Sequence, residues 1–197
     1  DWSSDVCSSD LGEEARLLIT RTEANVARTR ARVGTLLEYA RASGDGIQLE
    51  PLHLDDVVDE AAGARAGELE GAGVRVVTGE LPEVRGDRGQ LVKLFGVLLD
   101  NAIRHGGGRP LTVRVDAEVG PVLATVTVAN DGTPIDAEVR PRLFTLLPLG
   151  PNGNGQGEVP TGLAVARRIV EGHGGVIWCG LPEAGASISF TLPTVRG

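Results

Sequence analysis

An apolar pattern between residues 87 and 105 places its large side chains on one face only if the chain is helical. Apolar residues recur there at intervals of three and four, which is typical of an amphipathic helix with a wide buried stripe. Asp87 precedes the pattern, and aspartate is a preferred N-cap because its carboxylate accepts a hydrogen bond from a free N–H of the first turn. The stripe consists of Leu91, Leu94, Phe95, Leu98, Leu99 and Ala102.

Shorter patterns on both sides of this helix predict an α+β domain over residues 47–197. Alternating apolar and polar residues indicate antiparallel strands at 111–115 and 122–128, and a final hairpin at 176–179 and 187–192. Helices mixed with antiparallel strands give an α/β sandwich, in which an antiparallel or mixed sheet packs on helices. The other predicted elements are strands at 47–51 and 74–78 and helices at 54–69 and 162–173.

Residues 12–46 predict a long helix that precedes this domain. The stretch holds no proline, and an apolar seam recurs every seven residues, at Ile19, Val26, Val33 and Ala40. A seam of this period faces a partner helix, so we expect a helical hairpin or a dimer. The turn residues 43–46 end the helix.

The first eleven residues, DWSSDVCSSDL, show no periodicity. They resemble the conceptual translation of a common sequencing-adapter oligonucleotide, and the alternative is a flexible natural terminus. We set residues 1–11 aside from the fold. On the adapter interpretation, the natural gene continues upstream and the chain is a C-terminal fragment.

The composition excludes several classes of protein. Nineteen basic and 27 acidic residues give a net charge of −8, which argues against a sequence-independent nucleic-acid binder but permits a nucleotide carried with a divalent cation. No apolar run approaches the ~20 residues that span a bilayer. Two cysteines exclude a disulfide framework. We expect no nucleic-acid partner, no membrane contact by this segment and a cytoplasmic location, although a full-length protein can carry an anchor elsewhere.

Three polar features follow one another in an order that suits a nucleotide pocket. Asn101 lies at the edge of the buried helix face, where an amide oxygen can coordinate a hard cation such as Mg²⁺. Asn130 ends a strand before a tight glycine turn, a place suited to hydrogen bonding with the edge of a heterocycle. The helix that begins near Gly162 offers free N–H groups and a dipole that favour phosphate. Taken alone, Asn101 also fits a solvated helix edge, and the order of the three features favours the pocket.

These segments resemble the conserved boxes of sensor histidine kinases in the GHKL ATPase superfamily. DRGQLVKLFGVLLDNAIRHG resembles the N box, VANDGTPI the G1 box and PTGLAVARRIVEGHGG the second glycine box. Residues 142–144 resemble a shortened F box, and residues 174–193 resemble the C-terminal hairpin, with Gly185 and Phe190 at the expected places. The stretch RTEANVARTRARVGTLLEYARASG resembles the second helix of the dimerisation and phosphoacceptor hairpin.

The resemblance implies a GHKL-type sandwich preceded by one long hairpin helix, and it implies roles for single residues. Asn101 matches the asparagine that binds Mg²⁺, and Arg104 matches the basic residue that contacts phosphate; both count as catalytic. His105 matches the family residue whose ring lies beside the basic residue. Asn130 stands where the family has the aspartate that reads the adenine amino group, and its oxygen can accept the same bond. The other matching positions are Gly132, Ile135, Thr161, Gly162 and Leu163, and residues 148–160 match the ATP lid.

The function implied is that of an ATP-binding catalytic domain, which uses ATP and Mg²⁺ and passes the γ-phosphoryl group to a histidine. None of His53, His105 and His173 has the sequence context of a phosphoacceptor, so we expect that histidine on an upstream helix. The resemblance also implies a homodimer through the N-terminal helix and a response regulator receiver domain as partner.

Departures from the family pattern keep a second hypothesis open. Val97 stands where the family has a polar residue, Pro134 replaces the second G1 glycine, and Pro160 and Thr161 interrupt the second glycine box. The alternative is a degenerate, non-catalytic module that dimerises and binds nucleotide without transferring phosphate. A third hypothesis is another member of the superfamily, either an anti-sigma-type kinase or a chaperone-like ATPase. The long helix argues against an anti-sigma-type kinase, and Val97 argues against a chaperone-like ATPase.

Overall fold

The computed structural model divides the chain into two compact units, Asp1–Leu37 and Glu38–Gly197. We call them the N-terminal unit and the C-terminal domain. The structure describes residues 15–23, 25–26, 29–30, 34, 46–106, 110–145, 161–180 and 185–195.

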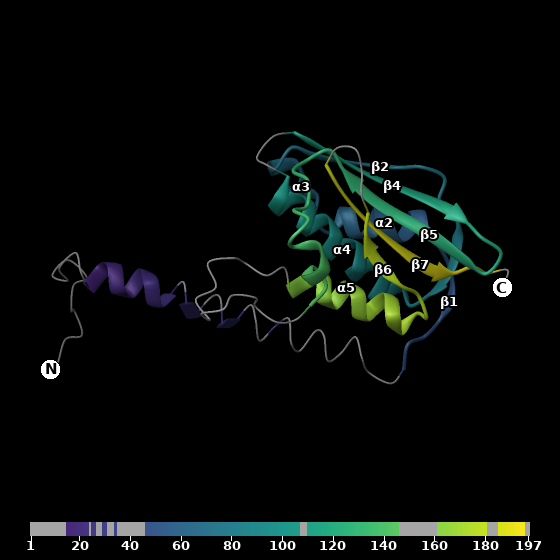
Figure 1. The fold of residues 1–197 in the computed structure, drawn as a ribbon, viewed down its shortest axis with the longest axis horizontal. Coiled ribbons are helices and arrows are strands. Elements are labelled where there is room, and N and C mark those ends of the chain that lie inside the picture. Colours follow the sequence, from purple (N-terminus) through teal and green to yellow (C-terminus); the bar gives the residue numbers. More distant parts are fainter. Residues whose placement is uncertain are drawn as a thin grey trace, which may run out of the picture. The chain divides into compact units, whose positions relative to one another are not determined.

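The described residues of the N-terminal unit are helical, as the sequence predicted for this stretch (Figure 1). Three threonine hydroxyls donate to the carbonyl oxygen four residues earlier, a bond that threonine makes inside helices. Ile19 and Val26, the described members of the apolar seam, are exposed within this chain, as are Leu17 and Leu18. The rest of the seam and residues 1–11 lie outside the described residues.

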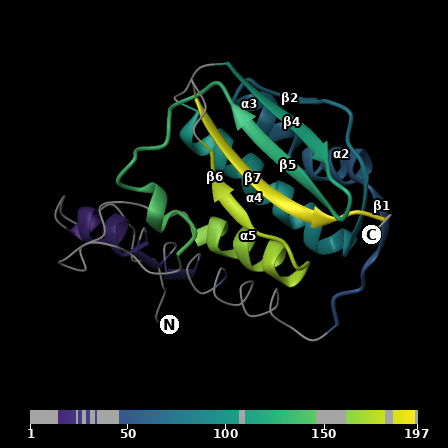
Figure 2. The ribbon, with the colours of Figure 1, turned by 45° about the vertical axis from the view of Figure 1, so that its right-hand side comes forward.

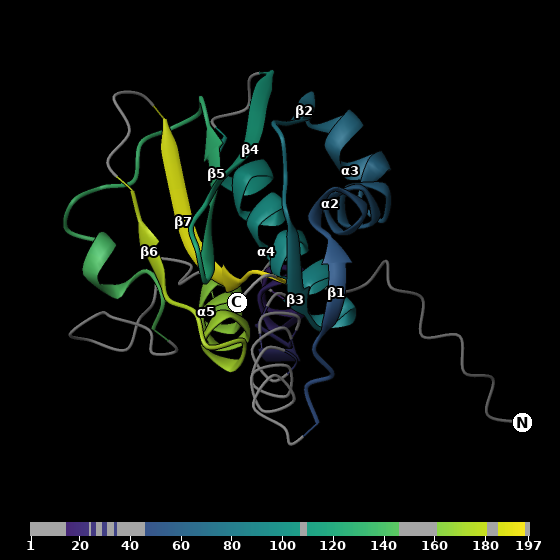
Figure 3. The same cartoon turned by 90° about the vertical axis from the view of Figure 1, so that its right-hand side faces the viewer.

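The C-terminal domain is a sheet with helices packed on one face (Figures 1 and 3). Its five-stranded sheet has the order β2-β4-β5-β7-β6, with β2 and β4 parallel and the other neighbours antiparallel. A second, two-stranded sheet pairs β1 with β3. The elements are β1 (Glu50–His53), α2 (Leu54–Gly63), α3 (Ala66–Gly71), β2 (Val74–Thr78), β3 (Glu83–Gly86), α4 (Arg88–His105), β4 (Leu111–Val119), β5 (Leu123–Asn130), the 3-10 turn η1 (Arg140–Arg142), α5 (Thr161–Gly172), β6 (Ile177–Cys179) and β7 (Ala186–Pro193).

Helix α4 is the centre of the helical layer, between α2 and α5 (Figure 2). The predicted apolar stripe is buried along its whole length, which confirms the helix and its register. Phe95 of the stripe meets Phe190 of β7 edge to face, with ring centroids 5.8 Å apart. Aromatic pairs in this geometry contribute stability beyond that of the apolar area they bury, so this contact holds the helical layer to the sheet.

The predicted helix over residues 54–69 is wrong as a single element, because the chain turns between α2 and α3. Arg65 precedes α3, and its guanidinium reaches across to α4, where Nη2 donates to Oδ2 of Asp100 at 3.2 Å and Nε to Oδ1 at 2.5 Å. Gly96 leaves room for this guanidinium, since a Cβ at that position would overlap it. A tertiary ion pair of this kind has no local sequence signal.

Two strands also differ from the predictions. Strand β3 was not predicted, because its four residues are too few to show an alternation. Strand β1 lies three residues later than the predicted 47–51, where it pairs with β3 in the register Glu50 to Gly86. Strands β4 and β5 are antiparallel as predicted, and longer.

Asp87 joins three parts of the domain. Its Oδ1 accepts the N–H of Gln90, which confirms the predicted N-cap of α4. Its Oδ2 accepts the N–H of Gln48, at 3.2 Å. Its own N–H donates to Nε2 of buried His173 at 3.0 Å. Because Nε2 accepts, the proton of the neutral ring lies on Nδ1, which donates to the carbonyl oxygen of Ile169 at 2.8 Å.

We expect His173→Ala to lower the free energy of unfolding by about 2–3 kcal/mol, because it leaves a part-buried N–H without a partner and opens a cavity at the end of α5. Urea denaturation followed by circular dichroism measures the change. His53→Ala is the matched control, since the exposed ring of His53 makes no side-chain cap bond; it should change the free energy by no more than about 0.5 kcal/mol. Equal effects of the two substitutions would contradict the role of His173.

Candidate functional site

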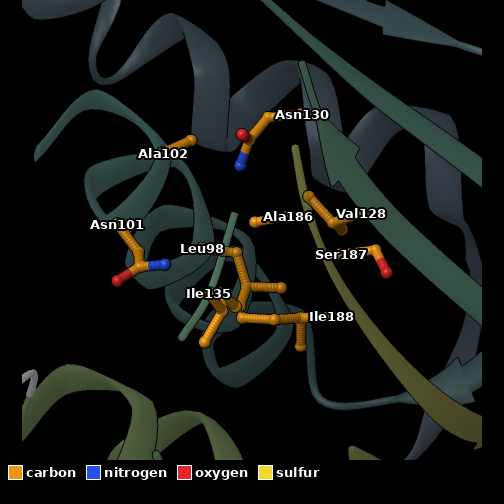
Figure 4. Close-up of a pocket in the computed structure, with 9 residues that line it drawn as sticks. All are labelled: Leu98, Asn101, Ala102, Val128, Asn130, Ile135, Ala186, Ser187 and Ile188. Carbon is orange, nitrogen blue, oxygen red and sulfur yellow. The ribbon is translucent and has the colours of Figure 1, made fainter. Parts of the chain in front are cut away.

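A pocket lies between α4, the ends of β5 and β7, and the segment that follows β5 (Figure 4). Six of its nine lining residues are apolar, and the others are two asparagines and a serine. The lining residues are Leu98, Asn101, Ala102, Val128, Asn130, Ile135, Ala186, Ser187 and Ile188. The cavity volume of about 10 Å³ is room for about one water molecule, so a larger ligand requires a wall residue to move. Ile135 is the lining residue that lies on neither a helix nor a strand.

Asn130 is the last residue of β5, opposite Ala186 of β7. Its Oδ1 accepts the N–H of Gly132 at 3.0 Å, a local bond that fixes the orientation of the amide. Gly185 packs against the backbone of Asn130: it has a φ of +73°, and a Cβ there would overlap the Asn130 carbonyl oxygen. Only glycine fits this position, so Gly185 helps to place Asn130 at the pocket.

Asn101 is half-buried on α4, on the other side of the pocket from Asn130 (Figure 4). Arg104 and His105 follow in the last turn of the same helix and are exposed. They do not line the pocket, but they lie three and four residues after Asn101 and so share its face of the helix. The edge of α4 on which the sequence placed Asn101 therefore lies next to a pocket.

Arg140 is a supporting residue that the sequence did not indicate. Its Nε donates to the carbonyl oxygen of Ile135 at 3.1 Å, so the turn η1 holds the wall of the pocket that comes from the segment after β5. The same guanidinium lowers the pKa of the Cys179 thiol, but burial raises it more, and the pKa lies above its usual value. A bond between a side chain and a backbone carbonyl in an irregular segment leaves no pattern in the sequence.

The first turn of α5 packs directly on α4. A Cβ at Gly162 would lie 3.1 Å from Cγ1 of Val97, so glycine permits the close approach of the two helices. Leu163 is fully buried in the core. Helix α5 begins at Thr161, as the sequence predicted to within one residue. The predicted lid, 148–160, lies outside the described residues.

The structure thus brings Asn101, Asn130 and Ile135 to one pocket and bonds Gly132 to Asn130. It places Gly162 and Leu163 in the helix beside α4. Within the described ranges, no group of three or more His, Cys, Asp and Glu residues is arranged to hold a metal ion. A single amide oxygen suits Mg²⁺, which keeps several waters and takes its other ligands from phosphates. Among the same residues, no helix is long and apolar enough to cross a membrane.

Residues 86–196 match the family model of the histidine kinase-, DNA gyrase B-, and HSP90-like ATPases. The match covers α4, the pocket and α5, and the chain belongs to this family. Within it, the chain corresponds to the ATP-binding catalytic domain of a sensor histidine kinase, as the resemblance of its boxes predicted.

Similar proteins include the methanogenesis regulatory histidine kinase FilI of Methanothrix harundinacea, 36% identical over 146 residues, which are 71% of this chain and 16% of FilI. The phytochrome-like protein Cph1 of Synechocystis is 26% identical over 94% of this chain and 25% of its own length. The chain therefore spans a quarter or less of these relatives.

A solved structure of the histidine kinase ThkA in complex with the response regulator protein TrrA has the same fold. Its TM-score is 0.71 at 22% identity, over 95% of this chain and 53% of that one. The catalytic domain of ThkA alone gives a TM-score of 0.62 at 23% identity, over 74% of this chain and 95% of that domain. The sandwich of a sheet on helices is the shared feature, and it confirms the predicted fold class.

We expect Gly185→Ala to destabilise the domain more than Gly174→Ala. Both glycines have positive φ, which costs alanine about 1 kcal/mol. Open space surrounds Gly174, whereas a methyl group at Gly185 displaces the backbone of Asn130, and such overpacking costs about 1–3 kcal/mol more. Urea denaturation of the two variants measures the difference. Equal losses would show that Gly185 does not fix Asn130.

Proposed function

We propose that this domain binds ATP with Mg²⁺ at the pocket between α4 and β5 and donates the γ-phosphoryl group to a histidine imidazole on an upstream helix. One observation carries the proposal: an apolar pocket with Asn130 at one side and Asn101 at the other, inside a family of ATPases. An apolar slot with a few placed polar groups is the usual form of a nucleotide-base site.

Each residue of the site has a separate task in this proposal. The base lies against Leu98, Val128 and Ile188, and Asn130 hydrogen-bonds its edge. Asn101 supplies an oxygen ligand to Mg²⁺, which when bound neutralises charge on the phosphates. Arg104 and His105 lie further along α4, and in this proposal they contact the phosphate oxygens. The backbone at the start of α5, around Thr161 and Gly162, adds N–H donors and the positive end of a helix dipole.

Transfer itself requires little reactive chemistry from this domain. A nitrogen of the acceptor imidazole forms a bond to the γ-phosphorus while the bond from that phosphorus to the β,γ-bridging oxygen breaks, and ADP leaves. The phosphoryl group then passes to a carboxylate of a response regulator. Positioning and charge neutralisation supply most of the acceleration in such reactions.

Two partners belong to the proposal. The exposed apolar residues of the N-terminal unit, Leu17, Leu18, Ile19 and Val26, support a homodimer through this helix. The complex of ThkA with a response regulator supports a receiver domain as the second partner. We place the activity in the cytoplasm, where ATP is available.

A second candidate function is a module that binds nucleotide and dimerises without transferring phosphate. The contact of Val97 with Gly162 favours it, because an apolar side chain fills the space between α4 and the start of α5. Valine neither ligates a metal nor orients a nucleophile. This candidate shares the pocket with the first and differs only in the transfer step.

We expect Asn101→Ala to weaken the binding of Mg²⁺–ATP by at least about tenfold, because it removes an oxygen ligand of the metal. Isothermal titration calorimetry with and without Mg²⁺ measures this. Asn101→Asp keeps an oxygen and should retain binding that depends on Mg²⁺.

The matched control is Gln48→Ala, which removes an exposed amide side chain and keeps the backbone N–H that bonds Asp87. Its affinity should equal that of the wild type. Wild-type affinity that does not change when Mg²⁺ is removed would contradict the assignment of Asn101.

We expect the chain, given ATP labelled at the γ-phosphate, to label a separately supplied helical hairpin that carries a phosphoacceptor histidine. The label should be labile in acid and stable in base, as phosphohistidine is, and a hairpin with that histidine changed to alanine should stay unlabelled. Electrophoresis and autoradiography detect the product. Binding of ATP by calorimetry without any label on the hairpin would exclude transfer and leave the second candidate.

A further inference from the structure

The amide of Asn130 has a fixed orientation in the pocket. Its Oδ1 lies on the side of Gly132, whose N–H it accepts at 3.0 Å. An amide turned by 180° would place its NH₂ group against that N–H, two donors facing each other, so the oxygen position is determined by the bond. In Figure 4 the nitrogen of the amide points into the space beside Ala186 and Leu98.

Asn130 is also the polar side chain best placed to read a base. Of the lining residues that the structure describes, Asn101 lies on the far side of the pocket and the hydroxyl of Ser187 points away from it (Figure 4). The remaining lining side chains are apolar and make no hydrogen bonds. The amide NH₂ of Asn130 is therefore the directional contact that a base meets, and it is a donor.

A donor at this position selects for an acceptor on the base. Position 6 of hypoxanthine or guanine is a keto oxygen, which accepts, whereas position 6 of adenine is an amino group, which donates. Adenine meets the amide through N1, which accepts from the NH₂ group, and through its amino group, which donates to the second lone pair of Oδ1. A 6-oxopurine meets the same amide through its keto oxygen, which accepts from the NH₂ group, and through its N1–H, which donates to Oδ1. A carboxylate would accept only, and would repel a keto oxygen.

We infer that Asn130 makes this site a purine site open to 6-oxopurine nucleoside triphosphates, and not one restricted to ATP. The inference rests on the proposed function, because it assumes that the pocket holds the base of a nucleotide. It adds a specificity that a carboxylate at the same position would not give. The bond to Gly132 fixes which atom of the amide faces Gly132 and leaves the NH₂ group for the base.

The test compares ITP with ATP, which differ at position 6 and in the proton on N1. Calorimetric titration of the whole chain in the presence of Mg²⁺ should give a dissociation constant for ITP that is below that for ATP or within threefold of it. Asn130→Asp should then bind ATP at least about tenfold more tightly than ITP, because a carboxylate leaves the keto oxygen without a donor. Gln48→Glu, the same exchange of amide for carboxylate at an exposed position, should leave both affinities unchanged.

The outcomes separate failure of the specificity inference from failure of the proposed function. Wild-type protein that binds ATP more than threefold more tightly than ITP overturns the specificity inference and leaves the proposed function standing. A ratio that is the same in the wild type and in Asn130→Asp also overturns it, provided that urea denaturation shows the variant to be folded. If folded wild-type protein binds neither nucleotide, the proposed function fails and the inference fails with it.

Discussion

A hydrogen bond from the N–H of Asp87 to Nε2 of His173 joins the first residues of α4 to the end of α5. The carboxylate of Asp87 caps α4 and also holds the segment before β1, so one residue fixes the ends of three parts of the chain. This bond helps to hold α4 in position against α5. Asn101 lies on α4, and the start of α5 packs against its middle, so the geometry of the candidate site depends on a junction at the far end of both helices.

The opposite wall of the site is fixed by backbone and not by side-chain packing. Asn130 is held between Gly185, which touches its carbonyl, and Gly132, which donates to its side chain. Contacts of this kind tolerate no added methyl group, and they leave the amide little freedom. The pocket therefore combines a rigidly held amide on the sheet with a wall at Ile135, whose carbonyl oxygen accepts from Arg140 and whose side chain packs against the core.

Sequence periodicity was sufficient to predict the parts of this domain that bury long stripes. The buried face of α4, its cap at Asp87 and the β4–β5 pair are confirmed, because each carries many residues in one regular pattern. Asn101 and Asn130, which the sequence marks as polar residues at the edge of such patterns, line one pocket, and their roles there stay a prediction. The contacts of Arg65 and Arg140 and the bond of His173 to Asp87 were not predicted, because each joins a residue far along the chain or in an irregular segment. Such bonds depend on the tertiary structure, and no window of sequence contains both partners in a recognisable spacing.

Binding and transfer are separable in this domain because they use different parts of α4. Leu98, Ala102 and the edge that carries Asn101 face the pocket, whereas Val97 faces the first turn of α5 through its contact with Gly162. A change at Val97 alters the space beside the start of α5, while Val97 is not among the residues that line the pocket. In the proposed function, the base site can therefore be complete while the transfer step is weakened, and the apolar contact between the two helices holds α5 in place in either case. Nucleotide affinity alone consequently does not distinguish a kinase from a binding module here; only the movement of the phosphoryl group does.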